Sequence, residues 1–474
     1  MAGPVELGAD PATPFDIASI AAGAAVSLAP AALVRVRAAR DVVERTLASG
    51  ASVYGLTTRL GSGRDERLAD DELIAYQRQV VANHRGGSGP LLPPTEVRAV
   101  IAARLALLLN GGSGVRVEVI EALARLLDAD SAAVDVPSRG SVGAADLALL
   151  APVLAELLER GLDLAPQEAA AFLSANAYSI GVGCLVAGEL DGLGLAADRA
   201  VALTLQAAGL HGTGGAISPF SVAVQQARGG VGQAASAARI RGLIADGNLF
   251  DSAREVTVQD PLSVRTAPQV TGAFLERVDA LRTELSLELA ARSENPVVDI
   301  TSASLVSGGN FAALPLTLAL ETLRLALAHV AAASERRIAV LSELQRPFRA
   351  AGTSVLPGLT WYGAAGALAE IRQLAAPVSL GATVLSGVED TASFAPTALQ
   401  LLRRSAELTR DVLAIEALHA AELVRLDDAS SRLGAASAPL AEALIALLES
   451  GVASDELVAR AGIRLSKEDS TAGD

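Results

Sequence analysis

Apolar residues recur at helical spacing along most of the chain, and the strict alternation typical of strands is rare. Helix boundary signals accompany the pattern: Pro30 stands near the start of one apolar segment and Gly50 at its end. Strand-like segments are limited to SVYGL at 52–56 and AAVDVP at 132–137. Helices are predicted over 29–50, 93–112, 117–129, 146–160, 167–190, 197–209, 231–245, 268–296 and 310–344.

The segment 310–344 is much longer than an ordinary helix and carries few charges for its length. A long helix that is apolar around most of its circumference is buried in a bundle or between subunits. We expect both for this segment, and therefore an all-α fold with a helical bundle at its centre.

The composition agrees with helices and excludes some partners. Apolar residues make up 51% of the 474 residues and aromatic residues only 3%. The net charge of −15 argues against binding to nucleic acid or to an anionic membrane, because both need a basic surface. The apolar segment 171–190 is interrupted by Ser174, Asn176 and Ser179, so it reads as a buried core helix rather than a membrane span.

Candidate metal ligands are few and scattered. The chain has one cysteine, Cys184, and four histidines without ligand spacing, so no metal site is predicted. Cys184 lies in an apolar segment and far in sequence from any histidine, which favours a buried small side chain over a catalytic thiol. Residues 1–16 lack the basic and apolar regions of a signal peptide, so we expect a cytoplasmic protein.

Loops rich in glycine or short polar residues separate the predicted helices, and loops on a rigid scaffold commonly carry function. Read in order, the chain contains VYGLTTRLG (53–61), GSGVR (112–116), VPSRGSVGA (136–144), VQDPLSVRTAPQVTGA (258–273), SENPVVD (293–299), SGGNF (307–311) and SERRI (334–338). In these pieces, their order and their spacing the chain resembles the aromatic amino acid ammonia-lyases, most of all histidine ammonia-lyase, from about residue 15 to 430.

The resemblance implies an all-α, ammonia-lyase/fumarase-like long-helix bundle that assembles as a homotetramer, with each active site shared between subunits. It also divides the chain. We expect an N-terminal part (1–195) with the site loops, a long-helix bundle with C-terminal helices (196–460), and a disordered tail (461–474), the first two forming one catalytic unit.

One family feature is missing. The family forms a methylidene-imidazolone electrophile from an Ala-Ser-Gly triad within Gly-Ser-Val-Gly-Ala-Ser-Gly-Asp-Leu. Here Gly143 and Ala144 are followed by Ala145 and Asp146, so the hydroxyl that would be lost and the glycine nitrogen that would attack are both absent. Leu262 also replaces the tyrosine of the family's QDPYSxR motif. We therefore expect no methylidene-imidazolone.

Other family positions are retained, and the resemblance assigns their roles. Tyr54 matches the acid or base of the inner loop, although an aromatic plug is the alternative. His84, with Asn83 before it, matches the position that contacts the substrate side chain, as a polar pocket residue or a proton carrier. Arg265 matches the arginine that binds the substrate carboxylate; a structural ion pair is the alternative. Further candidate binding residues are Asn176, Gln259, Asn310, Glu389 and Phe348, the last with core packing as the alternative.

The expected function is an enzyme that works on a small carboxylate substrate without the electrophilic ring. A substrate with an acidic proton or an activated double bond would allow elimination, addition, isomerisation or cyclisation by acid–base chemistry. We expect a role in specialised metabolism. A non-catalytic ligand-binding or scaffold protein and a conventional aromatic amino acid ammonia-lyase remain the alternatives.

Overall fold

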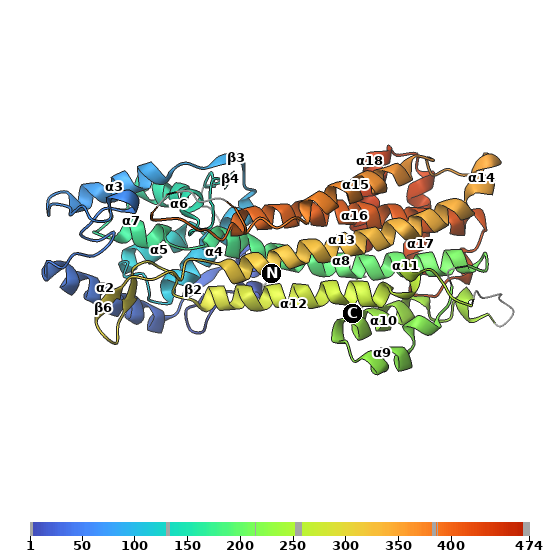
Figure 1. The fold of residues 1–474 in the computed structure, drawn as a ribbon, viewed down its shortest axis with the longest axis horizontal. Coiled ribbons are helices and arrows are strands. Elements are labelled where there is room, and N and C mark those ends of the chain that lie inside the picture. The colour runs from blue at the N-terminus through green and yellow to red at the C-terminus, as the bar shows by residue number, and fades with distance from the viewer. Residues whose placement is uncertain are drawn as a thin grey trace. The chain divides into compact units, whose positions relative to one another are not determined.

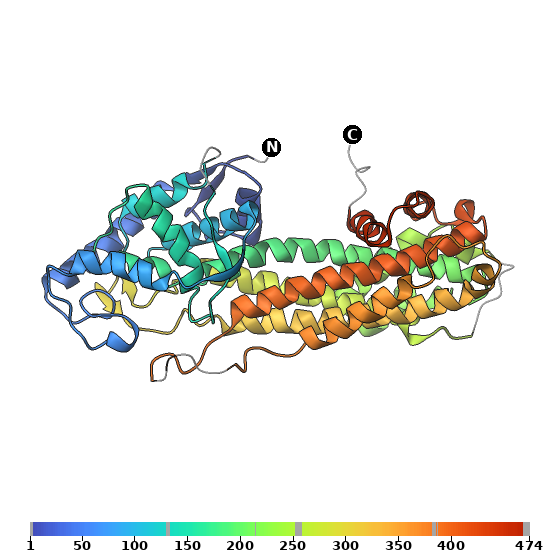
Figure 2. The same cartoon turned by 90° about the horizontal axis from the view of Figure 1, so that it is seen from above.

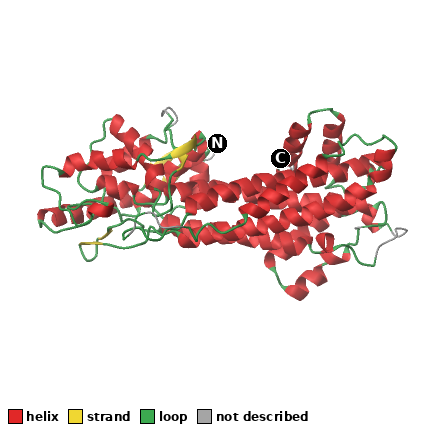
Figure 3. Ribbon diagram, turned by 45° about the horizontal axis from the view of Figure 1, so that its top comes forward, coloured by secondary structure: helices red, strands yellow, loops and turns green. Residues whose placement is uncertain are grey.

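A computed structural model describes residues 3–128, 133–213, 215–251, 258–381, 385 and 387–467. The described chain is mainly helical, with a few short strands (Figure 3). It divides into two compact units. Unit 1 holds residues 1–187, 281–320 and 377–400, and unit 2 holds 188–280, 321–376 and 401–474.

Four long helices contribute residues to both units (Figure 1). They are α8 (Ala177–Gly209), α12 (Ala267–Ala290), α13 (Leu314–Leu344) and α16 (Ala395–Leu426). The long apolar helices predicted at 268–296 and 310–344 are therefore confirmed, and so is the all-α class.

Unit 1 is built from helices and short strands around a cavity. Its other elements are β1 (Val5–Leu7), α1 (Pro14–Ala21), β2 (Val26–Leu28), α2 (Pro30–Ala48), η1 (Gly61–Gly63), α3 (Leu73–His84), β3 (Ser88–Leu91), α4 (Pro94–Leu109), α5 (Val117–Arg125), β4 (Pro137–Arg139), α6 (Leu147–Glu159), α7 (Glu168–Leu173), β5 (Val297–Asp299) and β6 (Ser304–Val306). Helix α3 packs on α6 and α7, and α4 packs on α1 and α5.

Unit 2 consists of packed helices (Figure 2). One cluster of buried side chains joins α13, α15 and α16, and another joins α8, α10 and α11. Its further elements are η2 (Ser218–Phe220), α9 (Val222–Arg228), α10 (Val231–Ile244), η3 (Asn248–Phe250), α11 (Leu262–Arg265), α14 (Arg346–Ala350), α15 (Thr360–Leu374), η4 (Ser430–Arg432), α17 (Ala438–Glu449) and α18 (Ser454–Ser466).

The strands form three two-stranded ladders, β1–β2 parallel and β3–β4 and β5–β6 antiparallel. The β3–β4 ladder pairs Ser88 with Arg139. It therefore places the segment after His84 beside the segment that leads into the 140–146 turn. The backbones approach closely there, because a Cβ on Gly140 would lie 2.8 Å from the Gly87 Cα.

Several local predictions were wrong. Residues 191–196 do not interrupt α8, while residues 174–176 separate α7 from α8. Helix α8 continues through Gly194 because α12 packs closely on that glycine: a Cβ there would lie 2.6 Å from Leu275 Cδ2. Residues 52–56 form no strand, and Tyr54 makes only an isolated bridge to Thr58.

The second predicted strand and the predicted tail also differ. Residues 133–136 are not extended in a ladder, and β4 begins only at Pro137. Residues 461–466 complete α18, and residues 468–474 lie outside the described residues.

Two apolar helical stretches, Glu168–Gly209 and Leu314–Leu344, could cross a membrane by length and composition alone. The most apolar part of the first stretch is 94% buried, as in the core helix of a soluble protein. The most apolar part of the second is 44% buried. This is weak support for a membrane span.

Candidate active site

A cavity of about 430 Å³ in unit 1 brings several of the predicted residues together. Its wall combines one phenol, one imidazole, one carboxylate, one carboxamide and two hydroxyls with apolar side chains. The lining residues are Tyr54, Leu60, Gly61, Ser62, His84, Ala144, Ala145, Leu147, Ala170, Leu173, Ser174, Asn295, Phe311, Leu385 and Glu389. Such a mixture of apolar walls and a few polar groups is typical of small-molecule sites.

Tyr54 is half-buried on a loop whose own hydrogen bonds fix it. The Thr57 hydroxyl donates to the Ala51 carbonyl at 2.8 Å and accepts the Val53 amide at 2.8 Å. The Tyr54 phenol oxygen accepts the Gly61 amide at 3.0 Å. This loop therefore places a phenol on the cavity wall with one lone pair already engaged.

His84 is the last residue of α3 and also lines the cavity. Its Nδ1 lies 2.7 Å from the Val80 carbonyl oxygen. Because a carbonyl can only accept, Nδ1 carries the hydrogen, and Nε2 of the neutral ring is left as an acceptor. Asn83 is exposed and is not among the lining residues.

The 140–146 turn forms another wall of the cavity through Ala144 and Ala145. Ser141 Oγ accepts the Gly143 amide at 3.1 Å and lies 3.1 Å from the Ala145 carbonyl oxygen. Ser393 Oγ donates to the Gly143 carbonyl at 2.8 Å. Ala145 has a φ of 59°, an unusual value for a residue with a Cβ. Hydrogen bonds from two segments thus hold this turn.

Asp146, at the end of the turn, is fully buried and does not line the cavity. Its carboxylate accepts the Ser179 amide, in the first turn of α8, at 2.9 Å, and its own amide donates to the Ala175 carbonyl at 2.8 Å. Burial raises the pKa of this carboxyl to about 6, although hydrogen bonds from Ser179 and Ser141 oppose the shift. Asp146 therefore joins the turn to the start of α8.

The connection between α7 and α8 holds Ser174, which was not predicted for the site, and Asn176, which was. Ser174 lines the cavity, and its Oγ accepts the Asn295 amide at 3.1 Å. Asn176 is fully buried instead, and its Nδ2 donates to the Phe311 carbonyl at 2.7 Å. Asn176 thus fixes Phe311, which lines the cavity, without lining it.

Glu389 lines the cavity as predicted, and its backbone pairs with Leu385. Asn310 is exposed, and its Nδ2 donates to the Arg292 carbonyl at 3.3 Å. Within the motif SGGNF it is therefore Phe311, and not Asn310, that reaches the cavity. The phenylalanine predicted for the site was Phe348.

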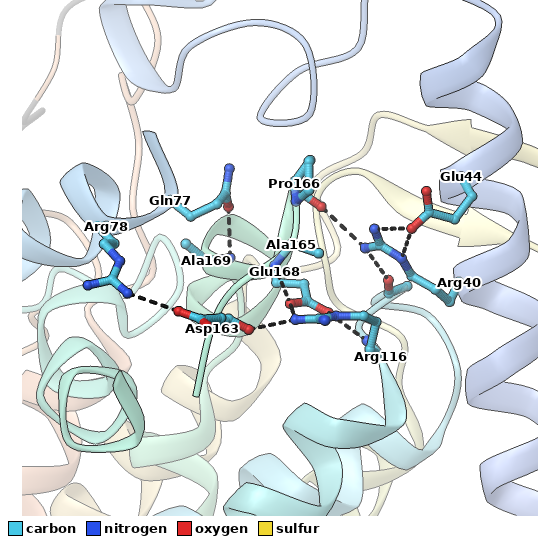
Figure 4. Close-up of polar contacts among 11 residues, drawn as sticks. Arg40, Glu44, Gln77, Arg78, Arg116, Asp163, Ala165, Pro166, Glu168 and Ala169 are labelled. Atoms are coloured by element: carbon cyan, nitrogen blue, oxygen red, sulfur yellow. Dashed lines mark hydrogen bonds and ion pairs between the residues drawn. The ribbon is translucent and has the colours of Figure 1, made fainter. Parts of the chain in front are cut away.

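A network of hydrogen bonds and ion pairs holds the start of α7 (Figure 4). Glu168 is fully buried and accepts the Arg116 backbone amide at 2.8 Å and its Nε at 2.9 Å. The Ala165 amide donates to the same carboxylate at 2.7 Å. Arg40 donates to the Pro166 carbonyl at 3.2 Å. The motif GSGVR thus holds the start of the helix that carries Ala170 and Leu173 to the cavity.

Three of the predicted binding residues belong to unit 2. Arg265 ends α11, and its buried Nε has no hydrogen-bond partner among the described residues. Arg337 fixes this segment by donating to the Ser263 carbonyl at 2.8 Å while it pairs with the buried Glu416 at 2.6 Å. Gln259 is exposed. Phe348 makes an edge contact with His211 at 6.4 Å between ring centroids.

The remaining candidate chemistry is structural. Cys184 is buried, and burial raises the pKa of its thiol to about 12, so it stays protonated as an inert side chain. The described residues contain no group of three or more His, Cys, Asp or Glu side chains that could hold a metal ion.

Comparison with known proteins fits this geometry. The sequence model of the aromatic amino acid lyases matches residues 12–162 and 153–449. Histidine ammonia-lyase of Stigmatella aurantiaca is 36% identical over 429 residues, which cover 84% of this chain and 83% of the relative.

Among solved structures, tyrosine aminomutase from Streptomyces globisporus is 25% identical with a TM-score of 0.86, covering 98% of this chain and 97% of that one. The ergothioneine-degrading enzyme ergothionase of Treponema denticola has the same fold, with a TM-score of 0.89 at 24% identity and 98% coverage of both chains. The family match spans most of the chain and includes every loop of the cavity; this protein belongs to the aromatic amino acid lyase family.

Proposed function

We propose that this family member is an enzyme that acts on a small carboxylate substrate by acid–base chemistry, without a methylidene-imidazolone. The observation that carries the proposal is the cavity in which Tyr54 and His84 face a wall made of Ala144 and Ala145. The wall offers two methyl groups where the family places its electrophile.

The residues of the turn do not fit the ring. Ala145 has no hydroxyl to lose, and the next backbone nitrogen belongs to Asp146 rather than to glycine. That Asp146 amide already donates to the Ala175 carbonyl at 2.8 Å, which directs it away from an attack on the Ala144 carbonyl. No step of the proposed reaction therefore passes through the ring.

Two polar groups of the cavity transfer protons in the proposed reaction. The Tyr54 phenol moves the proton, and its oxygen accepts the Gly61 amide at 3.0 Å. His84 Nε2, free to accept, takes or returns a second proton. Without an electron sink in the protein, the substrate itself must supply an acidic proton or an activated double bond.

The carboxylate of the substrate needs a cation, and no Arg or Lys lines the cavity of unit 1 among the described residues. Arg265, whose buried Nε has no hydrogen-bond partner in the described part of the chain, is the proposed partner, since a guanidinium binds a carboxylate through paired donors. Following the resemblance, we propose that homotetramer assembly in the cytoplasm brings Arg265, Gln259 and Phe348 of other subunits to each cavity.

Two measurements test the proposal. The intact mass of the purified protein should equal that of the unmodified sequence, with no added near-ultraviolet absorbance; a mass lower by two water molecules would show the ring and a conventional lyase. Substrates should then be screened among histidine, phenylalanine, tyrosine, ergothioneine and related carboxylates. Tyr54→Phe should lower kcat by about 100-fold or more without loss of folding. Undiminished turnover would remove Tyr54 from the mechanism.

A further inference from the structure

Two consecutive backbone amides each donate to a different phenol. The Leu60 amide donates to the Tyr76 oxygen at 2.8 Å, and the Gly61 amide donates to the Tyr54 oxygen at 3.0 Å. Tyr54 lines the cavity, whereas Tyr76 does not. The Tyr76 phenol thus binds the Leu60 amide. The next amide along the chain, that of Gly61, donates to Tyr54, the proposed acid–base group.

Tyr76 is itself held firmly. It lies on α3 with 8% of its surface exposed. The Arg59 guanidinium lies over its ring, 5.4 Å from the centroid. Arg59 also pairs with Glu66 at 3.4 Å and Glu72 at 3.6 Å. The hydroxyl of Tyr76 is therefore a fixed acceptor and not a mobile surface group.

The groups around Tyr54 come from three segments. His84, at the end of α3, and Glu389, before α16, line the cavity with Tyr54. The charges of Arg59 and Glu66 in the Tyr54 loop act on Tyr76 of α3. Burial raises the pKa of Tyr76, which favours the neutral form of this second phenol. Tyr76 can then act as a fixed neutral acceptor for the Leu60 amide.

We propose that Tyr76 is a positioning residue: its oxygen fixes the Leu60 amide and thereby keeps the Gly61 N–H directed at the Tyr54 oxygen. The catalytic meaning of this arrangement rests on the proposed function. A donor held against a phenol oxygen stabilises the phenolate more than the neutral phenol. Its loss should make proton release from Tyr54 harder by about 0.5–1 pH unit, the equivalent of one ordinary hydrogen bond.

The experiment follows Tyr54 directly, without a substrate. The chain has four tyrosines, so fluorine NMR of the full-length protein labelled with 3-fluorotyrosine gives few signals, and the Tyr54→Phe variant identifies that of Tyr54. In Tyr76→Phe the Tyr54 signal should titrate at a pH higher by about 0.5–1 unit. Tyr362→Phe is the matched control, because Tyr362 is 66% exposed and lies in unit 2.

An unchanged Tyr54 titration in a folded Tyr76→Phe variant would overturn the proposal, even if the variant melts earlier. If that variant does not fold, hydrogen exchange on the wild-type protein decides: the Leu60 and Gly61 amides should exchange slowly, and rapid exchange would contradict the bonds. Activity is a separate readout. Full turnover by Tyr54→Phe would refute the proposed function while leaving the titration result intact.

Discussion

Asp146 is a carboxyl that the fold has removed from water behind the cavity wall. Its pKa of about 6 in the native state lies above the ordinary value of 3.8. Native protein therefore binds more protons than unfolded protein between these two values, and the free energy of unfolding falls as pH rises through this window. The stabilising contribution is complete below about pH 4 and lost above about pH 6.

Asp146→Asn should remove this dependence, because the amide keeps an acceptor for the Ser179 amide but carries no charge. The free energy of unfolding of the variant relative to wild type should rise by about 3 kcal/mol between pH 4 and pH 7. Urea unfolding at several pH values measures the difference. A difference that does not change with pH would show that Asp146 keeps an ordinary pKa.

Single residues were predicted from sequence with mixed success. Tyr54, His84 and Glu389, which the resemblance assigned to the site, line one cavity, and their roles stay predictions. Ser174 and Phe311 were missed, although both stand within two residues of predicted ones. A motif fixes where a turn occurs, but the direction of each side chain depends on segments distant in sequence, such as the contact of Asn176 with the Phe311 carbonyl.

At the scale of elements, α7 depends on the buried Glu168 carboxylate and its partly exposed partner Arg116 rather than on its own length. It has only 6 residues, too few for an isolated helix. Glu168→Gln removes the charge that binds Arg116 and should lower the free energy of unfolding by about 2–4 kcal/mol. Thermal and urea unfolding measure the loss.

The matched control is the exposed pair Glu370–Arg404, whose side chains are 44% and 49% exposed. Glu370→Gln should leave the free energy of unfolding nearly unchanged, because solvent screens such pairs. Equal effects at both sites would contradict the role assigned to Glu168.

Elements with strong helical periodicity were predicted well, and their interruptions were not. Separate helices were predicted at 167–190 and 197–209, yet α8 continues between them, and Leu275 of α12 packs where a side chain at Gly194 would otherwise stand. Conversely, the real break at 174–176 falls in the stretch FLSANAY (172–178), which contains neither glycine nor proline. Both the continuation of α8 and the break before it depend on tertiary packing, which a local sequence pattern does not describe.

For the whole molecule, the composition and motifs predicted the fold class, while assembly is a matter for experiment. Helix α13 exposes Leu314, Leu318 and Leu325 at 45%, 48% and 53% of their surface in the single chain. Apolar rows of this kind mark surfaces that other chains cover. We expect light scattering to give four times the chain mass of 48.0 kDa.

Leu318→Arg should reduce that mass without changing helix content, since the residue is exposed in the single chain. Circular dichroism provides the folding control. If the wild-type protein is a monomer that is fully active, the proposal that Arg265 reaches a cavity of another subunit is wrong.

The turn at 140–146 has a consequence for how the enzyme becomes active. Ser141, Ser393 and Asp146 close it through hydrogen bonds alone. On the proposed function, nothing in the backbone has to be rearranged chemically after synthesis. The newly folded and assembled protein should then reach full activity at once, with no slow maturation phase in a cell-free translation time course.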